Sequence, residues 1–281
     1  MRLISLIFIM LLPIVASAQT KSSLVDEILT TSSIKVSIDS LPSQLSQFPA
    51  LLPIEGKNKA QLSESFLNEL SIGFNEAYAL NYIRNFLVAN GNEAYLQQTL
   101  AWLNTEAGQA VTQVELLANS SDPAELQHYV SMFDVNTCDQ QRLKLLNNII
   151  AQSEVSDLMF KMLERMMDPM LPAIARDYEK DVVESHKLME FKQKFSLQMQ
   201  MMEGQVKPVL AQKMLAAYAF AYRDLSVADL QRYSEFVSTP AGKHYVTLAN
   251  EAIINVSVDW VIQAIPNIVN VQRPQHAAVE E

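Results

Sequence analysis

One internal similarity constrains the fold of this chain more than any other feature. The sequence Trp-Leu-Asn-Thr-Glu-Ala-Gly at 102–108 corresponds to Phe-Val-Ser-Thr-Pro-Ala-Gly at 236–242, a shift of 134 residues. A second correspondence precedes it in both halves, at a shift of 121 residues, and pairs Leu24 with Leu145 and Ile28 with Ile149. Because both correspondences occur in the same order, they predict two copies of one structural unit.

The predicted units are residues 20–119 and 139–265, joined by a connecting helix within 120–138. The shift grows from 121 to 134 residues between the two correspondences, which predicts extra length in the middle of the second copy. Each unit alone would leave apolar faces exposed to water. We therefore expect the two units to pack together and bury those faces in a continuous core.

The apolar pattern predicts an all-α fold. Apolar residues recur at spacings of three and four, and the chain has only 6 Gly. Helix signals support this interpretation: Gly91 is expected to end a helix that spans 63–90, and Asn92 and Ser226 are expected to begin helices. Asp122 before a proline marks another helix start.

The repeated motif predicts a corner between two helices. Thr239 would cap a new helix, Pro240 would take its first position, and Gly242 would let another helix approach closely. Thr105 and Gly108 would form the same corner in the first copy. The predicted structural motif comprises Trp102, Thr105, Gly108, Phe236, Thr239, Pro240 and Gly242.

The second corner lies within a stretch that resembles a known family. Leu225 to Leu230, Phe236, the Thr-Pro-Ala-Gly corner and the pair Tyr245 and Val246 resemble the DUF2059 family of exported bacterial proteins. The resemblance is best over 225–251, and the first copy departs from it by lacking the proline. It implies a helical periplasmic domain of a Gram-negative bacterium. The family is named for its unknown function, so it supplies no catalytic residues.

The amino terminus predicts export. Arg2, the apolar stretch from Leu3 to Val15 and the small residues Ala16 and Ala18 are typical of a cleaved signal peptide over 1–18. The apolar stretch is shorter than the roughly 20 residues of a membrane-spanning helix. We therefore expect a periplasmic, secreted protein without a transmembrane anchor.

Charge, cysteine and motif content argue against several functions. The net charge of −10 disfavours nucleic acid, whose binding depends on Lys and Arg. Cys138 is the single cysteine, and we expect it to be buried. The 4 histidines form no metal-binding pair, and no nucleophile or phosphate-binding motif occurs. The sequence therefore predicts no catalytic residue, metal or cofactor.

Methionine is concentrated between the two repeats' matching ends. Met159, Met162, Met166 and Met170 share one face of a predicted helix. Ordinary core packing is the preferred interpretation, because Met fills irregular interiors. Two alternatives stay open: a copper(I) site built from thioethers, and a pliable groove for an apolar ligand or a partner helix.

The helix predicted from Ala252 to Ile265 is apolar on almost every side, so we expect it to lie between the two halves. Asp259 would need a partner there, and Pro266 is expected to end the helix. The polar tail, within 266–281, is expected to be disordered.

These observations favour an exported helical protein of the cell envelope that acts by binding or interaction rather than by chemistry. Two alternatives remain. The protein could carry an apolar small molecule in the Met-rich groove, or it could be an enzyme whose site is assembled from distant residues. The sequence names no partner and no oligomeric state.

Overall fold

The structure is a computed structural model. It describes residues 20–42, 73–154 and 211–271, with isolated positions between 157 and 207, and it describes side chains in the last segment through Gln263. These residues form helices and no strand, so the predicted all-α class is confirmed. The signal peptide at 1–18 and the tail at 272–281 lie outside the described residues.

The first half of the chain contains α1 (Lys21–Thr31), α2 (Ile34–Asp39), α6 (Glu76–Asn90), α7 (Glu93–Leu103) and α8 (Glu106–Asn119). The connecting segment holds α9 (Pro123–Met132) and the short 3₁₀ turn η1 (Val135–Thr137). The second half contains α10 (Gln140–Ser153), a helical segment at 211–221, α13 (Val227–Ser238) and α14 (Pro240–Val271).

Helix starts follow the predicted capping residues. The side chains of Asn92 and Ser226 accept hydrogen bonds from the backbone N–H three residues later, and each begins its helix. Asp122 likewise caps α9, with Pro123 in the first position. The predicted helix over 63–90 is described only from Glu76, where Asn75 is the cap.

Gly91 ends α6 as predicted, but its backbone is extended, with φ −69°, rather than left-handed. Glycine is needed at this position because a side chain would not fit. A Cβ atom there would lie 2.6 Å from the carbonyl oxygen of Leu87 and 2.7 Å from a methyl carbon of Leu96.

Two clusters of buried apolar side chains form the interior. The first core cluster takes residues from α1, α2, α6 and α7, together with Leu248, Ala252, Val256, Trp260 and Val261 of α14. The second core cluster takes residues from α10, the segment 211–225 and α13, together with Val111 of α8. Partly buried Trp102 and Tyr245 contact both clusters.

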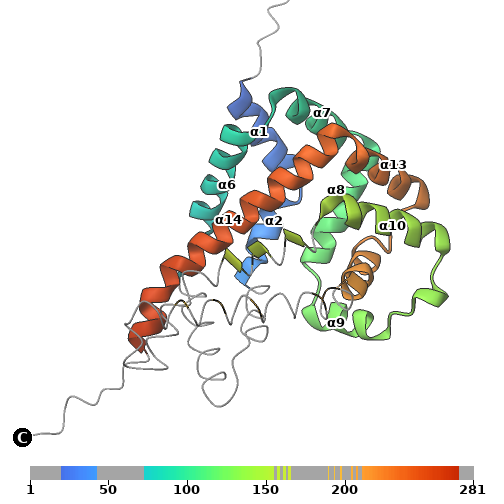
Figure 1. The fold of residues 1–281 in the computed structure, drawn as a ribbon. Coiled ribbons are helices and arrows are strands. Elements are labelled where there is room, and N and C mark those ends of the chain that lie inside the picture. Colours follow the sequence, from blue (N-terminus) through green and yellow to red (C-terminus); the bar gives the residue numbers. More distant parts are fainter. Residues whose placement is uncertain are drawn as a thin grey trace, which may run out of the picture.

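The last helix of each predicted unit therefore contributes to the other unit's core. Figure 1 shows α14 as a long diagonal that starts beside α13 and runs down past α6. It contacts α6 and α7 of the first half, while α8 contacts α13 of the second. This exchange places much of the apolar helix 252–265 against the first half.

The expected end of that helix at Pro266 is wrong, because α14 continues to Val271. Proline removes the hydrogen bond that would reach the carbonyl of Ile262, one turn earlier. The side chain of Ile262 is 43% exposed, so water can reach this part of the helix. None of the described helices is both apolar enough and long enough to span a bilayer.

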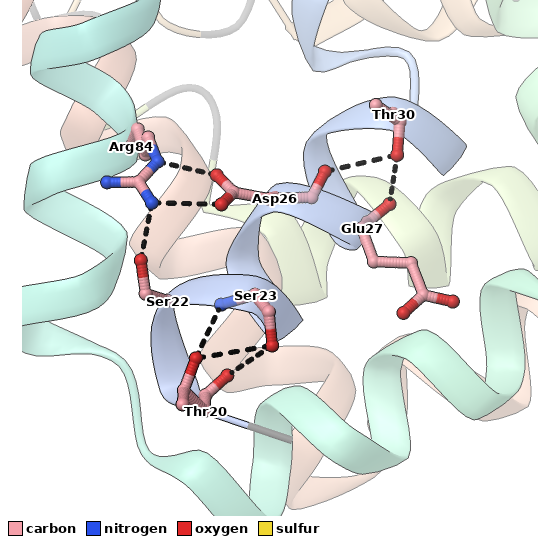
Figure 2. A network of polar contacts seen from close by, with 7 residues as sticks. All are labelled: Thr20, Ser22, Ser23, Asp26, Glu27, Thr30 and Arg84. Atoms are coloured by element: carbon pink, nitrogen blue, oxygen red, sulfur yellow. Dashed lines mark hydrogen bonds and ion pairs between the residues drawn. The ribbon is translucent and has the colours of Figure 1, made fainter. Parts of the chain in front are cut away.

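A polar network joins α6 to α1. Figure 2 shows the Arg84 guanidinium reaching across to the Asp26 carboxylate, with Nε 2.5 Å from Oδ1 and the second nitrogen 2.9 Å from Oδ2. The same guanidinium also donates to the hydroxyl of Ser22. The hydrogen bonds from Arg84 hold the pKa of Asp26 below its ordinary value. This two-point contact sets the orientation of α6 on α1.

Candidate functional site

The two predicted corners have the same backbone geometry. Thr105 has φ −74° and ψ 159°, and Thr239 has φ −75° and ψ 158°. Each hydroxyl accepts a hydrogen bond of 3.0 Å, from the N–H of Gly108 or Gly242. Each hydroxyl also donates to the carbonyl three residues earlier. Pro240 occupies the first position of α14.

Each corner glycine faces the helix that precedes it. A Cβ atom on Gly108 would lie 2.2 Å from the carbonyl oxygen of Trp102, and one on Gly242 would lie 2.0 Å from that of Phe236. Atoms cannot approach so closely without a shift of the backbone. The glycines therefore permit the tight bend between consecutive helices.

The aromatic residues of the two corners contact each other. The rings of Trp102 and Phe236 are stacked, with centroids 4.1 Å apart and planes inclined by 7°. Tyr233 also stacks on Trp102, with ring centroids 5.5 Å apart. The structure thus brings together two motif residues that are 134 positions apart.

A partly buried polar cluster lies beside this aromatic stack. The carboxylate of Glu115, on α8, accepts hydrogen bonds from the hydroxyls of Ser33 at 2.6 Å and Tyr222 at 2.7 Å. Tyr233 also donates to it, at 3.4 Å. Ser33 lies in the first half of the chain, and both tyrosines lie in the second. One carboxylate therefore links the two halves.

Burial decides the protonation of this cluster. Desolvation raises the pKa of Glu115 above its ordinary value, although the three hydroxyl donors oppose the rise. Desolvation, followed by the nearby Glu115 charge, raises the pKa of Tyr222 and of Tyr233 well above the ordinary value. Both phenols therefore keep their protons and remain donors.

His244 has a partner that the sequence did not reveal. Its Nε2 accepts a hydrogen bond of 2.9 Å from the backbone N–H of Asn92, and its ring lies 5.4 Å from that of Tyr95. An accepting nitrogen carries no proton, so the imidazole is neutral. Burial, with a smaller effect of the Lys21 charge, lowers the pKa of His244.

A cavity of about 230 Å³ lies between α6 and α14, at the end of α2. Its walls are mainly apolar and aromatic. They are formed by Leu41, Gly73, Phe74, Asn75, Tyr78, Ala79, Val256, Trp260 and Gln263. Its volume is below the roughly 300–1,000 Å³ of pockets for drug-sized ligands, so it has room for a smaller molecule only.

Trp260, in the wall of this cavity, has a polar group without a partner. The indole is only 6% exposed, and Nε1 has no hydrogen-bond acceptor among the described residues. A Cβ atom on Gly73 would lie 3.6 Å from Nε1. Nε1 itself exposes less than 1 Å² of surface, so protein atoms cover the N–H. Leaving such a donor buried and unpaired costs about 1–3 kcal/mol.

Two residues that line the cavity bind an acidic side chain. Asp259, which was expected to need a partner, accepts hydrogen bonds of 2.7 Å from the hydroxyl of Tyr78 and from the amide of Gln263. The bond to Asp259 raises the pKa of Tyr78, so its hydroxyl stays protonated. Asn75 is occupied in capping α6.

The Met-rich stripe contributes little to the described part of the chain. Met159, Met166 and Met170 lie outside the described residues, and Met162 is partly buried against the first core cluster. Cys138 is partly exposed, so its expected burial is wrong. It follows the 3₁₀ turn in the connecting segment, away from both cores, and its thiol lies 3.4 Å from the carbonyl of Asp134.

Sequence reasoning missed both Glu115 and the cavity. Glu115 is an ordinary acidic residue of an amphipathic helix, and its partners are 82, 107 and 118 positions away. In the sequence, nothing distinguishes Trp260 from the other apolar residues of α14. In the described part of the chain, no group of three or more His, Cys, Asp or Glu could hold a metal ion.

Comparison with family models, with curated proteins and with solved structures finds no match to this chain.

The corner geometry predicts the effect of enlarging Gly242. Gly242→Ala should lower the free energy of unfolding by about 1–3 kcal/mol, because the added methyl collides with a backbone carbonyl. Urea unfolding followed by circular dichroism measures the loss. Gly204→Ala is the matched control, since its Cβ would meet open space. An unchanged urea midpoint in Gly242→Ala contradicts the steric argument.

The Glu115 cluster predicts a pH-dependent stability difference. Because the folded-state pKa is raised, Glu115 loses its stabilising effect as pH rises through that pKa. The uncharged Glu115→Gln variant should therefore gain stability relative to wild type as pH rises above 4.5, the ordinary value for this carboxyl. Glu115→Ala should cost about 1–3 kcal/mol, because the hydroxyls lose their acceptor.

Urea titrations at several pH values measure the Glu115 effect. Glu235→Gln, on the exposed face of α13, is the control and should track wild type. A wild-type minus Glu115→Gln difference that stays constant with pH would overturn the assignment.

His244 predicts the opposite pH dependence. Because burial lowers its folded-state pKa, its contribution is present above the ordinary value of 6.5 and is lost as pH falls through the folded pKa. Wild type should therefore lose stability relative to His244→Gln as pH falls below 6.5. His128→Gln, at an exposed position, should show no such difference in the same thermal unfolding series.

Proposed function

We propose that this protein is an exported helical binding protein of the cell envelope, and that it holds a small apolar molecule in the cavity between α6 and α14. The cavity of about 230 Å³, whose walls include Phe74, Ala79, Val256 and Trp260, is the observation that carries the proposal. Apolar and aromatic walls with a few polar groups are typical of small-molecule sites.

The packing around the cavity supports a site formed in advance. Ala79 is 3% exposed and Val256 is 2% exposed, and both belong to the core contact between α6 and α14. Phe74 packs on Trp260 with ring centroids 4.7 Å apart, which restrains the indole. A wall made of core residues keeps its shape when no ligand is bound, so little ordering is needed on binding.

We also propose that the chain arose from two copies of one unit, and that it belongs to the DUF2059 family. The matched corners, the stacked pair Trp102 and Phe236, and the exchange of α8 and α14 between the two cores support the duplication. Export to the periplasm is proposed from the amino-terminal sequence alone.

The two alternatives gain less support. The carrier with a Met-rich groove depends on residues outside the described part of the chain, apart from Met162, which packs on the first core cluster. For an enzyme, Glu115 would be the natural acid or base. Its hydroxyl partners instead all point at the carboxylate itself, an arrangement that joins the two halves.

Ligand-dependent stability tests the proposal. Toluene at ten times its dissociation constant should raise the free energy of unfolding of wild type by about 1.4 kcal/mol. Ala79→Leu places a larger side chain in the cavity. It should abolish the gain in free energy of unfolding, because toluene then has no space to bind. Thermal unfolding of the purified full chain with and without toluene measures both effects.

Ala118→Leu, on the partly buried face of α8 and outside the cavity lining, controls for an added apolar side chain and should keep the response to toluene. Equal stabilisation of wild type and Ala79→Leu would place the guest elsewhere and contradict the proposed site.

A further inference from the structure

We infer that the cavity between α6 and α14 takes a small primary amine, whose apolar body fills the cavity and whose ammonium group pairs with the carboxylate of Asp259 where the cavity opens to water. The inference rests on the proposed function and adds the chemical class of the ligand. Such pairing requires a carboxylate beside the opening, an oxygen atom that is accessible, and no cation already bound to it.

The cavity opens beside Asp259. Four of the residues that line it are exposed to water, and they form its mouth: Gly73, Asn75, Tyr78 and Gln263. The Tyr78 hydroxyl and the Gln263 amide each donate a hydrogen bond of 2.7 Å to Oδ2 of Asp259. Two side chains of the mouth therefore hold the carboxylate, which lies one hydrogen bond away from the lining of the cavity.

One oxygen of this carboxylate is accessible. Both hydrogen bonds end on Oδ2, and no described residue donates to Oδ1. In the described part of the chain, the unpartnered side-chain polar atoms that protein atoms cover completely are Thr99 Oγ1 and Trp260 Nε1. Oδ1 of Asp259 is not one of them, so water reaches it. A ligand group that donates hydrogen bonds can replace that water.

The carboxylate of Asp259 has no cationic partner among the described residues. Arg165 donates instead to the side chain of Asn255, at 2.7 Å, one turn earlier on α14. Lys35 lies 3.7 Å from the carboxylate of Glu76. A ligand ammonium would supply the missing positive charge, and the net charge of −10 favours the approach of cations over anions.

Aromatic rings add a second attraction for an ammonium group. Tyr78 is 44% exposed at the mouth, and its ring centroid lies 6.3 Å from that of Tyr82. Phe74 and Trp260 form further parts of the wall. The face of an aromatic ring attracts a cation, because the electron density of the ring is concentrated there. The carboxylate and the rings therefore favour the same ligand charge.

The volume of the cavity limits the apolar body to about one ring. A cavity of roughly 150 Å³ holds benzene, and this cavity has about 230 Å³. A phenyl ring with a two-carbon chain therefore fits, and the chain can carry a terminal group out to the mouth. The buried residues Ala79 and Val256 supply apolar wall, which favours a hydrocarbon body.

Matched probes test the ligand class on the purified full chain. The probes 2-phenylethylamine, 2-phenylethanol and 3-phenylpropanoate share a ring and a two-carbon chain, and they end in a cationic, a neutral and an anionic group. Titrations followed in ¹H–¹⁵N spectra give each dissociation constant. The amine should bind about two- to tenfold more tightly than the alcohol, because an exposed ion pair and a cation–π contact each add a modest gain. The anion should bind most weakly.

Charge removal tests the role of Asp259. Asp259→Asn keeps the shape of the side chain and an acceptor for Tyr78, so it should bring the amine to the affinity of the alcohol and leave the alcohol unchanged. Glu251→Gln removes the same charge from an exposed position of α14 outside the cavity lining, and it should keep the preference for the amine. In wild type, raising NaCl from about 20 mM to about 500 mM should reduce the preference, because salt screens an exposed ion pair.

The outcomes separate the ligand class from the proposed function. If the alcohol or the anion binds as tightly as the amine, or if Asp259→Asn keeps the preference, the ligand class is wrong while the cavity remains a binding site. If Ala79→Leu binds the amine as tightly as wild type does, the amine lies outside the cavity and the inference fails. If neither toluene nor any of these probes binds wild type, the proposed function fails together with the inference.

Discussion

The rest of the structure depends on the contact between the two helix corners. Trp102 and Phe236 lie at matching places in two similar segments, and their rings stack with centroids 4.1 Å apart. A flat aromatic pair buries much apolar area and restricts the angle at which its helices meet. Because each corner bends sharply at a glycine, the helix after it crosses into the other half of the chain. The two cores are therefore built from both halves.

This exchange explains where the polar residues can lie. Glu115 stands on α8, the helix that the first half contributes to the second core cluster, and there it meets Tyr222 and Tyr233. A carboxylate at this position is costly to desolvate, so its three hydroxyl partners are needed to keep it in place. His244 makes a smaller link in the other direction, from α14 to the start of α7. The two groups respond to pH with opposite sign.

The cavity lies where α14, the helix that the second half contributes, packs against the first half of the chain. The later turns of α14 cross α6, and the side chains between them leave about 230 Å³ unfilled beside Trp260. Interior packing normally removes such space, and buried donors normally find acceptors. The unfilled space and the unpaired N–H of Trp260 both occur where α14 crosses α6, although protein atoms cover the N–H itself. A small-molecule site would account for the unfilled space.

The sequence alone determined the local structure of this protein. Asn92, Thr105 and Ser226 each begin a helix. The side-chain oxygen of each accepts a hydrogen bond from the backbone N–H three residues later, so the interaction lies within one helical turn. The spacing of apolar residues at three and four positions predicted the all-α class for the same reason. The repeated corner motif predicted two similar bends, and these have the same backbone geometry. These features depend on neighbours in the chain.

Only the tertiary structure decided which distant groups meet. It placed Trp102 on Phe236, gave Glu115 its hydroxyl partners, gave Asp259 its partner Tyr78, and left Trp260 without one. It also carried α14 beyond Pro266, where a local rule predicted an end. Such contacts join residues more than 80 positions apart, and their energies depend on burial that no single segment specifies.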